Sequence, residues 1–299
     1  RGRIHLMKRQ FWKKTRERTE KTRGELSTKY RLAAAAFLLV LSAVLMILAA
    51  QNPEYAEWHS TYIYPVLVTV IGHISGVFPF SLAEVLLYLL LILFVITLIR
   101  MIVRAVRASS AGIIASWISG VLLAAGILAF LYTVCCGVNY HRKSFSEEEG
   151  IVTYDYTVEE LQEVCFCLAE EVNALSGDVL RDEAGVMELD GPEGEAAADA
   201  MRTLAEEYSS LKGYYPQPKK LIVSEVLSYQ SLTGIYSPFT VEANYNGDMT
   251  AYNIPFTTCH ELSHLRGFMQ EQEANFIAFL ACAGSERTDF QYSGYLSAW

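Results

Sequence analysis

Three long apolar runs, at residues 32–50, 82–103 and 113–138, most constrain what this chain can fold into. A helix of about 20 apolar residues spans the ~30 Å hydrocarbon layer of a bilayer. Inside lipid every backbone N–H and C=O must find a partner within the protein, so a single run of this kind can only be a helix. The sequence therefore predicts three transmembrane helices in an anchor region at residues 32–138.

Two further apolar features test this assignment. The first run exceeds the ~7–15 apolar residues of a cleaved signal peptide, so an uncleaved anchor is favoured. A fourth stretch, residues 64–80, is short and is interrupted by glycine and proline. If it also crossed the membrane, the basic loop with Arg104 and Arg107 would lie outside, against the positive-inside tendency. We therefore expect a short interfacial or re-entrant helix there.

Charge is distributed unevenly along the chain, whose formal net charge is −9. Residues 1–31 contain twelve Lys or Arg against three Glu, whereas residues 137–299 contain nine Lys or Arg against twenty-seven Asp or Glu. A basic segment directly before an apolar run is typical of a flexible cytoplasmic arm. Three crossings from there place residues 139–299 outside the cytoplasm, and their acidity argues against nucleic acid as a partner.

The outer part contains an HExxH motif at residues 260–264. On a helix this spacing places the imidazoles of His260 and His264 on one face, a single turn apart, where both can bind one Zn²⁺. Glu261 then leans towards a metal-bound water and can take its proton. Thr257 or Thr258 favours a helix start just ahead of the motif. The sequence therefore predicts a zinc-dependent hydrolytic site.

A catalytic zinc site needs a third protein ligand and an open fourth position. Residues 271–280 are predicted to form a second helix, polar at its start and apolar after it. Glu271 and Asn275 are four residues apart and share a face, so we favour Glu271 as the third ligand and Asn275 as a residue that orients a ligand histidine. Glu273 is the alternative third ligand, although it points towards the apolar side of this helix.

The remaining outer segments predict a mixed α+β domain. Thr157 and Glu160 form a capping box that starts an amphipathic helix. A second helix is expected at residues 193–211, and strands are expected at residues 221–227 and 236–245. An edge strand beside the helix of the HExxH motif could pair with an extended peptide. The segment just before the HExxH motif is well placed for that role.

Several blocks of the sequence together resemble known families. HExxH followed by a glutamate four residues before an Asp or Asn is similar to the gluzincin zinc peptidases. Residues 238–244, the HELSHLRG and EQEANFIAFLAC blocks and residues 292–295 more closely resemble a bacterial membrane family, domain of unknown function 3810. The resemblance covers about residue 30 to the end. It implies a zincin-like fold with a metal site in a bacterial cell membrane protein, and a further C-terminal piece beyond residue 299.

The expected function is hydrolysis of a peptide or protein substrate by a membrane-anchored zinc metallopeptidase, with Glu261 as general base. Tyr245 and Tyr236 are candidate donors to the developing oxyanion, by their position in the sequence only. The alternative is a catalytically silent zinc-binding sensor or scaffold of the bacterial envelope. The expected partners are the lipid bilayer and a polypeptide substrate, with Zn²⁺ as cofactor.

Overall fold

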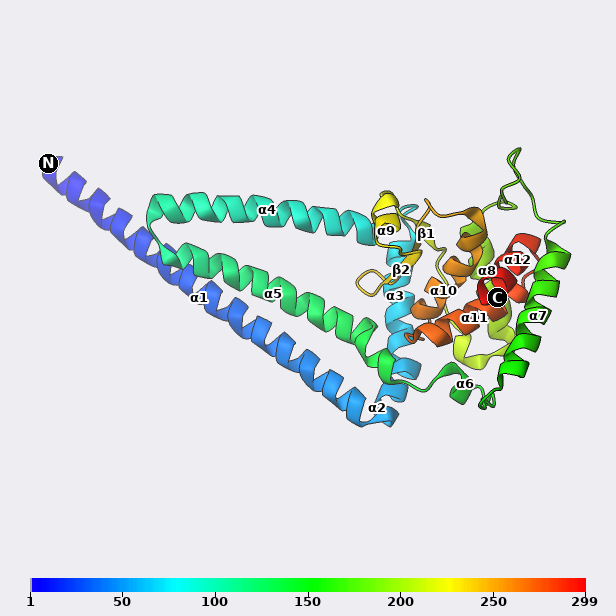
Figure 1. Ribbon diagram of the computed structural model, residues 1–299. Coiled ribbons are helices and arrows are strands. Elements are labelled where there is room, and N and C mark those ends of the chain that lie inside the picture. The colour runs from blue at the N-terminus through cyan, green and yellow to red at the C-terminus, as the bar shows by residue number, and fades with distance from the viewer. Residues whose placement is uncertain (1) are drawn as a thin grey trace. The chain divides into compact units, whose positions relative to one another are not determined.

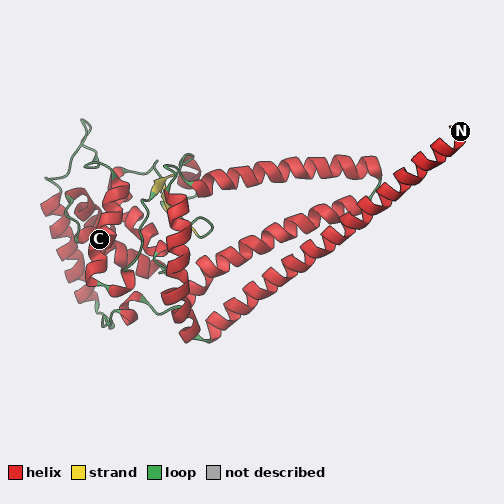
Figure 2. Ribbon diagram, turned by 180° about the vertical axis from the view of Figure 1, so that it is seen from behind, coloured by secondary structure: helices red, strands yellow, loops and turns green. Residues whose placement is uncertain are grey.

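The structure, a computed structural model, describes the backbone of residues 2–299 and the side chains of Trp12 and residues 24–299. The chain divides into two compact units. The first unit comprises residues 1–45 and 87–131, and the second comprises residues 46–86 and 132–299. Helices make up most of both units, as Figures 1 and 2 show. The second unit is therefore discontinuous in sequence.

Three long helices supply the first unit: α1 (Gly2–Gln51), α4 (Leu82–Ala108) and α5 (Ala111–Cys135). Among the described residues, α4, α5 and the Gly24–Gln51 part of α1 are the helices long and apolar enough to cross a membrane. Three apolar helices were predicted at these places, and the structure has them. α5 approaches α1 closely at Gly126, where an added Cβ would lie 3.2 Å from the carbonyl oxygen of Ala35.

The basic segment ahead of the first apolar run is helical, whereas a flexible arm was predicted. α1 continues without a break from Gly2 into the apolar residues. Lysine, arginine and glutamate are good helix formers, and extension of an existing helix avoids the cost of nucleating a new one. The apolar run and the basic arm therefore form one helix.

The second unit contains shorter helices. Its first part holds α2 (Pro53–Trp58), the π-helix η1 (His59–Ile63) and α3 (Tyr64–Gly76). Its later part holds η2 (Gly137–His141), α6 (Phe145–Glu148), α7 (Val158–Leu175), α8 (Glu193–Glu207), η3 (Ser209–Leu211), α9 (Glu225–Tyr229), η4 (Ala251–Asn253), α10 (Ile254–Leu265), α11 (Glu271–Ala283) and α12 (Thr288–Ala298). The capping box of Thr157 and Glu160 begins α7 as predicted.

A small three-stranded sheet completes the second unit. Its strand order is β1 (Lys219–Lys220), β3 (Glu242–Tyr245), β2 (Gly234–Ser237), with β1 parallel and β2 antiparallel to β3. The strand predicted at residues 221–227 is wrong, because β1 ends at Lys220 and α9 follows. The strand predicted at residues 236–245 is a hairpin, because Pro238 ends the first strand and its turn includes Val241 at φ +51°.

The hydrophobic core of the second unit is built around α10. Cys259, Leu262 and Leu265 of this helix are fully buried. Helices α8, α11 and α12 and strands β2 and β3 all pack against α10, which Figure 1 shows as the pale orange helix within this unit. Burial of one helix on several sides fixes its rotation, and hence the direction in which its polar side chains point.

Two buried carboxylates fasten the start of α4 to the sheet of the second unit. Glu242 of β3 accepts hydrogen bonds from the backbone N–H groups of Leu82 and Ala83, at 3.0 and 2.7 Å, and pairs with Lys219 of β1. In return, Glu84 of α4 accepts from the N–H groups of Ile222 and Val223, at 2.6 and 2.9 Å. Glu242 thus binds backbone N–H groups at the start of α4, and Glu84 binds those of the two residues that follow Leu221 after β1. We call this arrangement the carboxylate clasp.

Candidate metal centre

Helix α10 positions the two motif histidines. It begins at Ile254, earlier than predicted, and Thr257 and Thr258 lie inside it instead of capping it. The Thr258 hydroxyl donates to the carbonyls of Ile254 and Pro255. The HExxH motif therefore lies within a helix of the hydrophobic core, with His260 and His264 on the same face of that helix.

The end of α10 depends on Gly267. Its φ of +98° favours glycine, and an added Cβ would lie 3.1 Å from both the ring of Tyr64 and the guanidinium of Arg142. Gly267, which ends this helix, thus also permits α3 to approach it closely.

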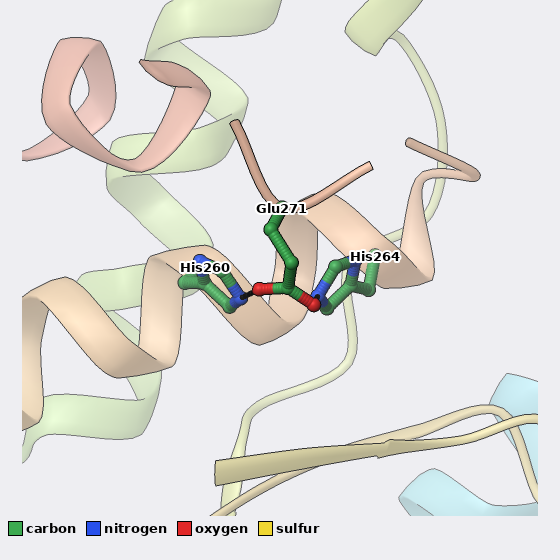
Figure 3. Close-up of side chains that lie close together, drawn as sticks. All are labelled: His260, His264 and Glu271. Atoms are coloured by element: carbon green, nitrogen blue, oxygen red, sulfur yellow. Dashed lines mark ion pairs between the residues drawn. The ribbon is translucent and has the colours of Figure 1, made fainter. Parts of the chain in front are cut away.

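The first residue of α11 completes a group of three possible metal ligands. His260 Nε2 lies 3.3 Å from one Glu271 carboxylate oxygen, and His264 Nε2 lies 3.6 Å from the other. Figure 3 shows the carboxylate between the two rings. Ligand atoms about 2.0–2.2 Å from a tetrahedral zinc ion lie about 3.3–3.6 Å apart. The donor set and its spacing therefore fit a zinc ion.

Both imidazole rings are held by their Nδ1 atoms. His260 Nδ1 lies 2.8 Å from the amide oxygen of Asn275, and His264 Nδ1 lies 2.8 Å from the backbone oxygen of Phe268. Because both acceptors are oxygens, each Nδ1 carries a proton and donates it, which leaves the Nε2 lone pair facing Glu271. Asn275, the residue predicted to orient a ligand histidine, lies beside His260. The backbone acceptor at Phe268 could not be predicted, because every residue has a backbone carbonyl.

The electrostatics of the centre favour neutral imidazoles. Burial, aided by the neighbouring His264, lowers the pKa of His260 to about 4. Burial also lowers the pKa of His264, against the opposing effects of the Phe268 carbonyl and Glu271. A neutral imidazole is the form that binds a metal, so both rings are ready to act as ligands at neutral pH.

Glu273, the alternative third ligand, lies elsewhere. One of its carboxylate oxygens accepts a hydrogen bond of 2.6 Å from the backbone N–H of Phe145, at the start of α6. Two residues along a helix differ by about 200° in direction, so Glu271 and Glu273 face different neighbours. The structure brings Glu271, and not Glu273, to the two histidines.

Glu261 is buried beside the edge strand β2. Its side chain is 4% exposed, and its carboxylate accepts a hydrogen bond from the backbone N–H of Tyr236. Its Oε2 atom has no hydrogen-bond partner among the described residues. Burial, together with the charge of Glu271, raises the pKa of this carboxyl well above its usual range. A raised carboxyl pKa suits a group that must accept a proton and later return it.

Gly234 makes room for Glu261, and the sequence alone did not single it out. An added Cβ at this position would lie 2.5 Å from Oε1 of Glu261 and 2.9 Å from the carbonyl oxygen of Asn244. Since Thr233 and Asn246 form a hydrogen-bonded pair, the N–H and C=O groups of Gly234 and Tyr236 point away from β3, to the free edge of β2. Glu261 therefore sits against that free edge.

The hydroxyl groups of the two candidate oxyanion donors, Tyr236 and Tyr245, contact groups other than the three possible metal ligands. The Tyr236 hydroxyl lies 2.9 Å from the Tyr64 hydroxyl and 3.1 Å from the carbonyl oxygen of Cys135. The Tyr245 hydroxyl donates to the carboxylate of Glu193. Each partner lies far from these tyrosines in sequence, so the spacing of residues could not reveal it.

The comparison with family models identifies the chain's relatives. Residues 59–299 match the family described as Protein of unknown function (DUF3810). The chain belongs to this family. The DUF3810 match contains the metal-centre residues and helices α4 and α5, and it begins after the first apolar run, later than the residue 30 expected from the resemblance. No curated protein and no solved structure matches the chain.

Proposed function

We propose that this protein is a membrane-anchored zinc metallopeptidase. The observation that carries the proposal is the convergence of His260 Nε2, His264 Nε2 and the Glu271 carboxylate, with each Nδ1 atom fixed by an oxygen acceptor. Two imidazoles and a carboxylate make up a known catalytic zinc site, which keeps a fourth position open. When bound, zinc would lower the pKa of a water to ~7 and polarise a substrate carbonyl.

Glu261 supplies the proton transfers in this proposal. Its carboxylate accepts a proton from the attacking water and delivers it to the leaving amine. Asn275 and Phe268 hold the two ligand rings in place while the charge at the site changes. Because Glu261 already lies against β2, a peptide aligned along this strand would present its bonds to the carboxylate.

The free edge of β2 supports a polypeptide substrate. Its backbone groups at Gly234 and Tyr236 are not paired with β3, and they can pair with an extended peptide as a further strand. Ile235 between them is 48% exposed and can contact substrate side chains. Glu261 must release the Tyr236 N–H for that pairing, since one donor cannot serve both partners fully.

That same hydrogen bond favours the second candidate function, a catalytically silent zinc-binding sensor or scaffold of the bacterial envelope. A general base that is buried and bound to β2 is separated from solvent, as it would be in a site that binds metal without turnover. The two functions share the metal ligands and differ in whether Glu261 reacts. Hydrolysis therefore distinguishes them, and metal content alone does not.

The test uses the full chain in lipid nanodiscs, with elemental analysis and a library of quenched fluorogenic peptides. We expect about one zinc per chain, lost in His264→Ala and kept in the control His141→Ala. We expect Glu261→Gln to keep zinc and to lower hydrolysis by a factor of at least about 10², the lower range for general acid–base catalysis. Zinc binding without hydrolysis of any peptide would favour the sensor, and a folded protein that binds no zinc would refute both functions.

We also propose that residues 139–299 lie outside the cytoplasm. The basic residues before the first apolar run and those at the C-terminal end of α4, Arg104 and Arg107, support this orientation. Protease added to sealed right-side-out vesicles should cut the exposed segment 152–157, and protease added to inside-out vesicles should leave it intact.

A further inference from the structure

The segment that joins the first two apolar helices carries an unexplained surface. Helices α2, η1 and α3 lie between Gln51, where α1 ends, and Leu82, where α4 begins. Residues 58–81 of this segment contain no Asp, Glu, Lys or Arg. It was predicted to be an interfacial or re-entrant helix, and the structure has a short helix that is not long enough to be among the three candidate spans.

One face of α3 belongs to the core of the second unit. Tyr64, Val68, Gly72 and Ser75 are buried, at helical spacing. The absent side chain of Gly72 lets the Tyr214 ring approach to 3.2 Å from the position of a Cβ. Lys219 of β1 donates a hydrogen bond of 2.7 Å to the carbonyl oxygen of Ser75. α3 is therefore a structural part of this unit and is fixed at both ends.

The opposite face of α3 is apolar and exposed. Val66, Val70 and Ile74 lie four residues apart and are 58%, 55% and 60% exposed. Aromatic side chains extend the surface at both ends, with Trp58 and Tyr62 before α3 and Phe78 and Phe80 after it. We call these seven residues the α3 face. A stripe of this length without a charge is not typical of a surface that meets water.

We propose that the α3 face rests on the lipid bilayer surface. The chain enters this segment directly from one candidate membrane helix and leaves it directly into another, which supports lipid as the occupant. Aromatic residues at the ends of a segment are typical of the membrane–water interface. A helix with one apolar face in lipid and its other face on protein lies in the plane of the membrane instead of crossing it.

This surface is connected directly to the metal centre. The Tyr64 hydroxyl, on the buried side of α3, lies 2.9 Å from the carbonyl oxygen of Leu265, the residue after His264. It also lies 2.9 Å from the hydroxyl of Tyr236 on the edge strand β2. One side chain thus links the α3 face to the helix that holds both histidines and to the strand beside Glu261.

The consequence for the substrate rests on the proposed function. A centre fixed by short hydrogen bonds to a helix on the bilayer stays close to the membrane, whereas a centre on a flexible stalk would not. The substrates are therefore polypeptide segments held near the same surface, in membrane-anchored proteins. Tethering confines such segments and raises their effective concentration at the site.

The first test measures lipid contact without any need for activity. Nitroxide labels are attached through a ketone-bearing amino acid at Val70, Ile74 and, as a control, Tyr229, which is 92% exposed. The full chain is reconstituted in phosphatidylethanolamine–phosphatidylglycerol liposomes. We expect oxygen to relax the labels at 70 and 74 more than a water-soluble nickel complex does, with the reverse at 229. Nickel-accessible labels at all three sites, or dipolar coupling between two copies at 70 and 74, would overturn the proposal.

The second test concerns the substrate class. Hydrolysis of one peptide sequence is measured free in solution and attached to a lipid anchor in the same liposomes. We expect Val70→Asp with Ile74→Asp to lower hydrolysis of the anchored peptide at least tenfold relative to the free one. The control Tyr229→Asp, at the exposed residue used as the control in the first test, should leave the ratio unchanged. Zinc content and thermal unfolding establish that the variants fold.

The outcomes separate the two proposals. If the labels contact lipid and the wild-type protein cleaves neither peptide, the proposed peptidase function is refuted and the proposal that the α3 face contacts lipid is supported. Two outcomes would refute the substrate class and leave the peptidase function in place. In the first, both peptides are cleaved and the anchored one is not cleaved faster than the free one. In the second, the anchored peptide is cleaved faster, and the double variant cleaves it as fast as the wild-type protein does.

Discussion

Glu271 and Glu273 lie two residues apart on one helix and have unrelated partners. Glu271 is 75% exposed at its side chain yet contacts both motif histidines, whereas Glu273 accepts a hydrogen bond from the first residue of α6. The proposed ligand, Glu271, is thus the more exposed carboxylate. This fits its role, because a catalytic metal must remain open to water and substrate.

Replacement of each glutamate by glutamine tests this division. Glu271→Gln should abolish stoichiometric zinc binding, because an amide is a weaker zinc ligand than a carboxylate. Glu273→Gln should keep the zinc and lower the free energy of unfolding by about 1 kcal/mol, since it weakens one charged hydrogen bond. Elemental analysis and denaturant unfolding of the two variants measure both effects. Loss of zinc in Glu273→Gln alone would reverse the assignment.

The residues of the candidate centre could be predicted only where local spacing determines their geometry. His260 and His264 share a helix face because they are four residues apart, and so do Glu271 and Asn275. Predicting a helix is therefore enough to place the two members of each pair on one face. How the second pair meets the first depends on the turn at Gly267 and on core packing. The hydroxyl partners of Tyr236 and Tyr245 are 52 or more positions away in the sequence. A periodic pattern of residues gives no information about contacts between such distant positions.

At the scale of elements, the strand β2 and the helix α10 can pack closely because Gly234 has no side chain and leaves space for Glu261. The sequence predicted helices at α7, α8, α10 and α11, because caps and apolar periodicity are local signals, and it missed α6, α9 and α12. It missed the hairpin of β2 and β3, because apolar and polar residues alternate from Phe239 to Tyr245, through the turn that follows Pro238. It therefore did not identify the strand that contacts Glu261.

Gly234→Ala tests the fit between these elements. Its Cβ would overlap the Glu261 carboxylate and the Asn244 carbonyl, so either the side chain or the strand must move. We expect hydrolysis to fall at least tenfold with zinc retained, and the free energy of unfolding to fall by about 1–3 kcal/mol, as for other overpacked sites. Gly177→Ala is the control, because nothing lies within 4 Å of its added Cβ. Unchanged activity in Gly234→Ala would show that Glu261 does not need this position.

At the scale of the whole molecule, the second unit includes residues from both sides of the two later apolar helices, α4 and α5. The carboxylate clasp is a polar connection inside this unit, with Glu242 and Lys219 both buried. Composition predicted an anchor followed by a separate domain. It could not predict that residues 46–86 fold with residues 132–299, because that depends on contacts between distant segments.

The buried ion pair of the clasp gives a prediction for stability. Lys219→Met alone should lower the free energy of unfolding by about 3–5 kcal/mol, because it leaves the Glu242 charge buried without its cation. Lys219→Met with Glu242→Gln should recover part of this loss, since the amide carries no charge and can still accept from one N–H group of α4. Unfolding of the full chain in detergent, followed by tryptophan fluorescence, measures both. A double variant less stable than Lys219→Met would contradict this account.

The discontinuity of the second unit also determines how the protein could be processed. A single proteolytic cut just before Tyr132 would separate the C-terminal residues from the three long apolar helices, but it would leave Tyr64, Val68 and the rest of α3 behind. The released fragment would then lose two side chains of its hydrophobic core and the hydrogen bonds of the Tyr64 hydroxyl to Leu265 and Tyr236. Shedding into the surrounding medium, which can spread the activity of an enzyme tethered by a single stalk, would here dismantle the fold that carries the metal centre.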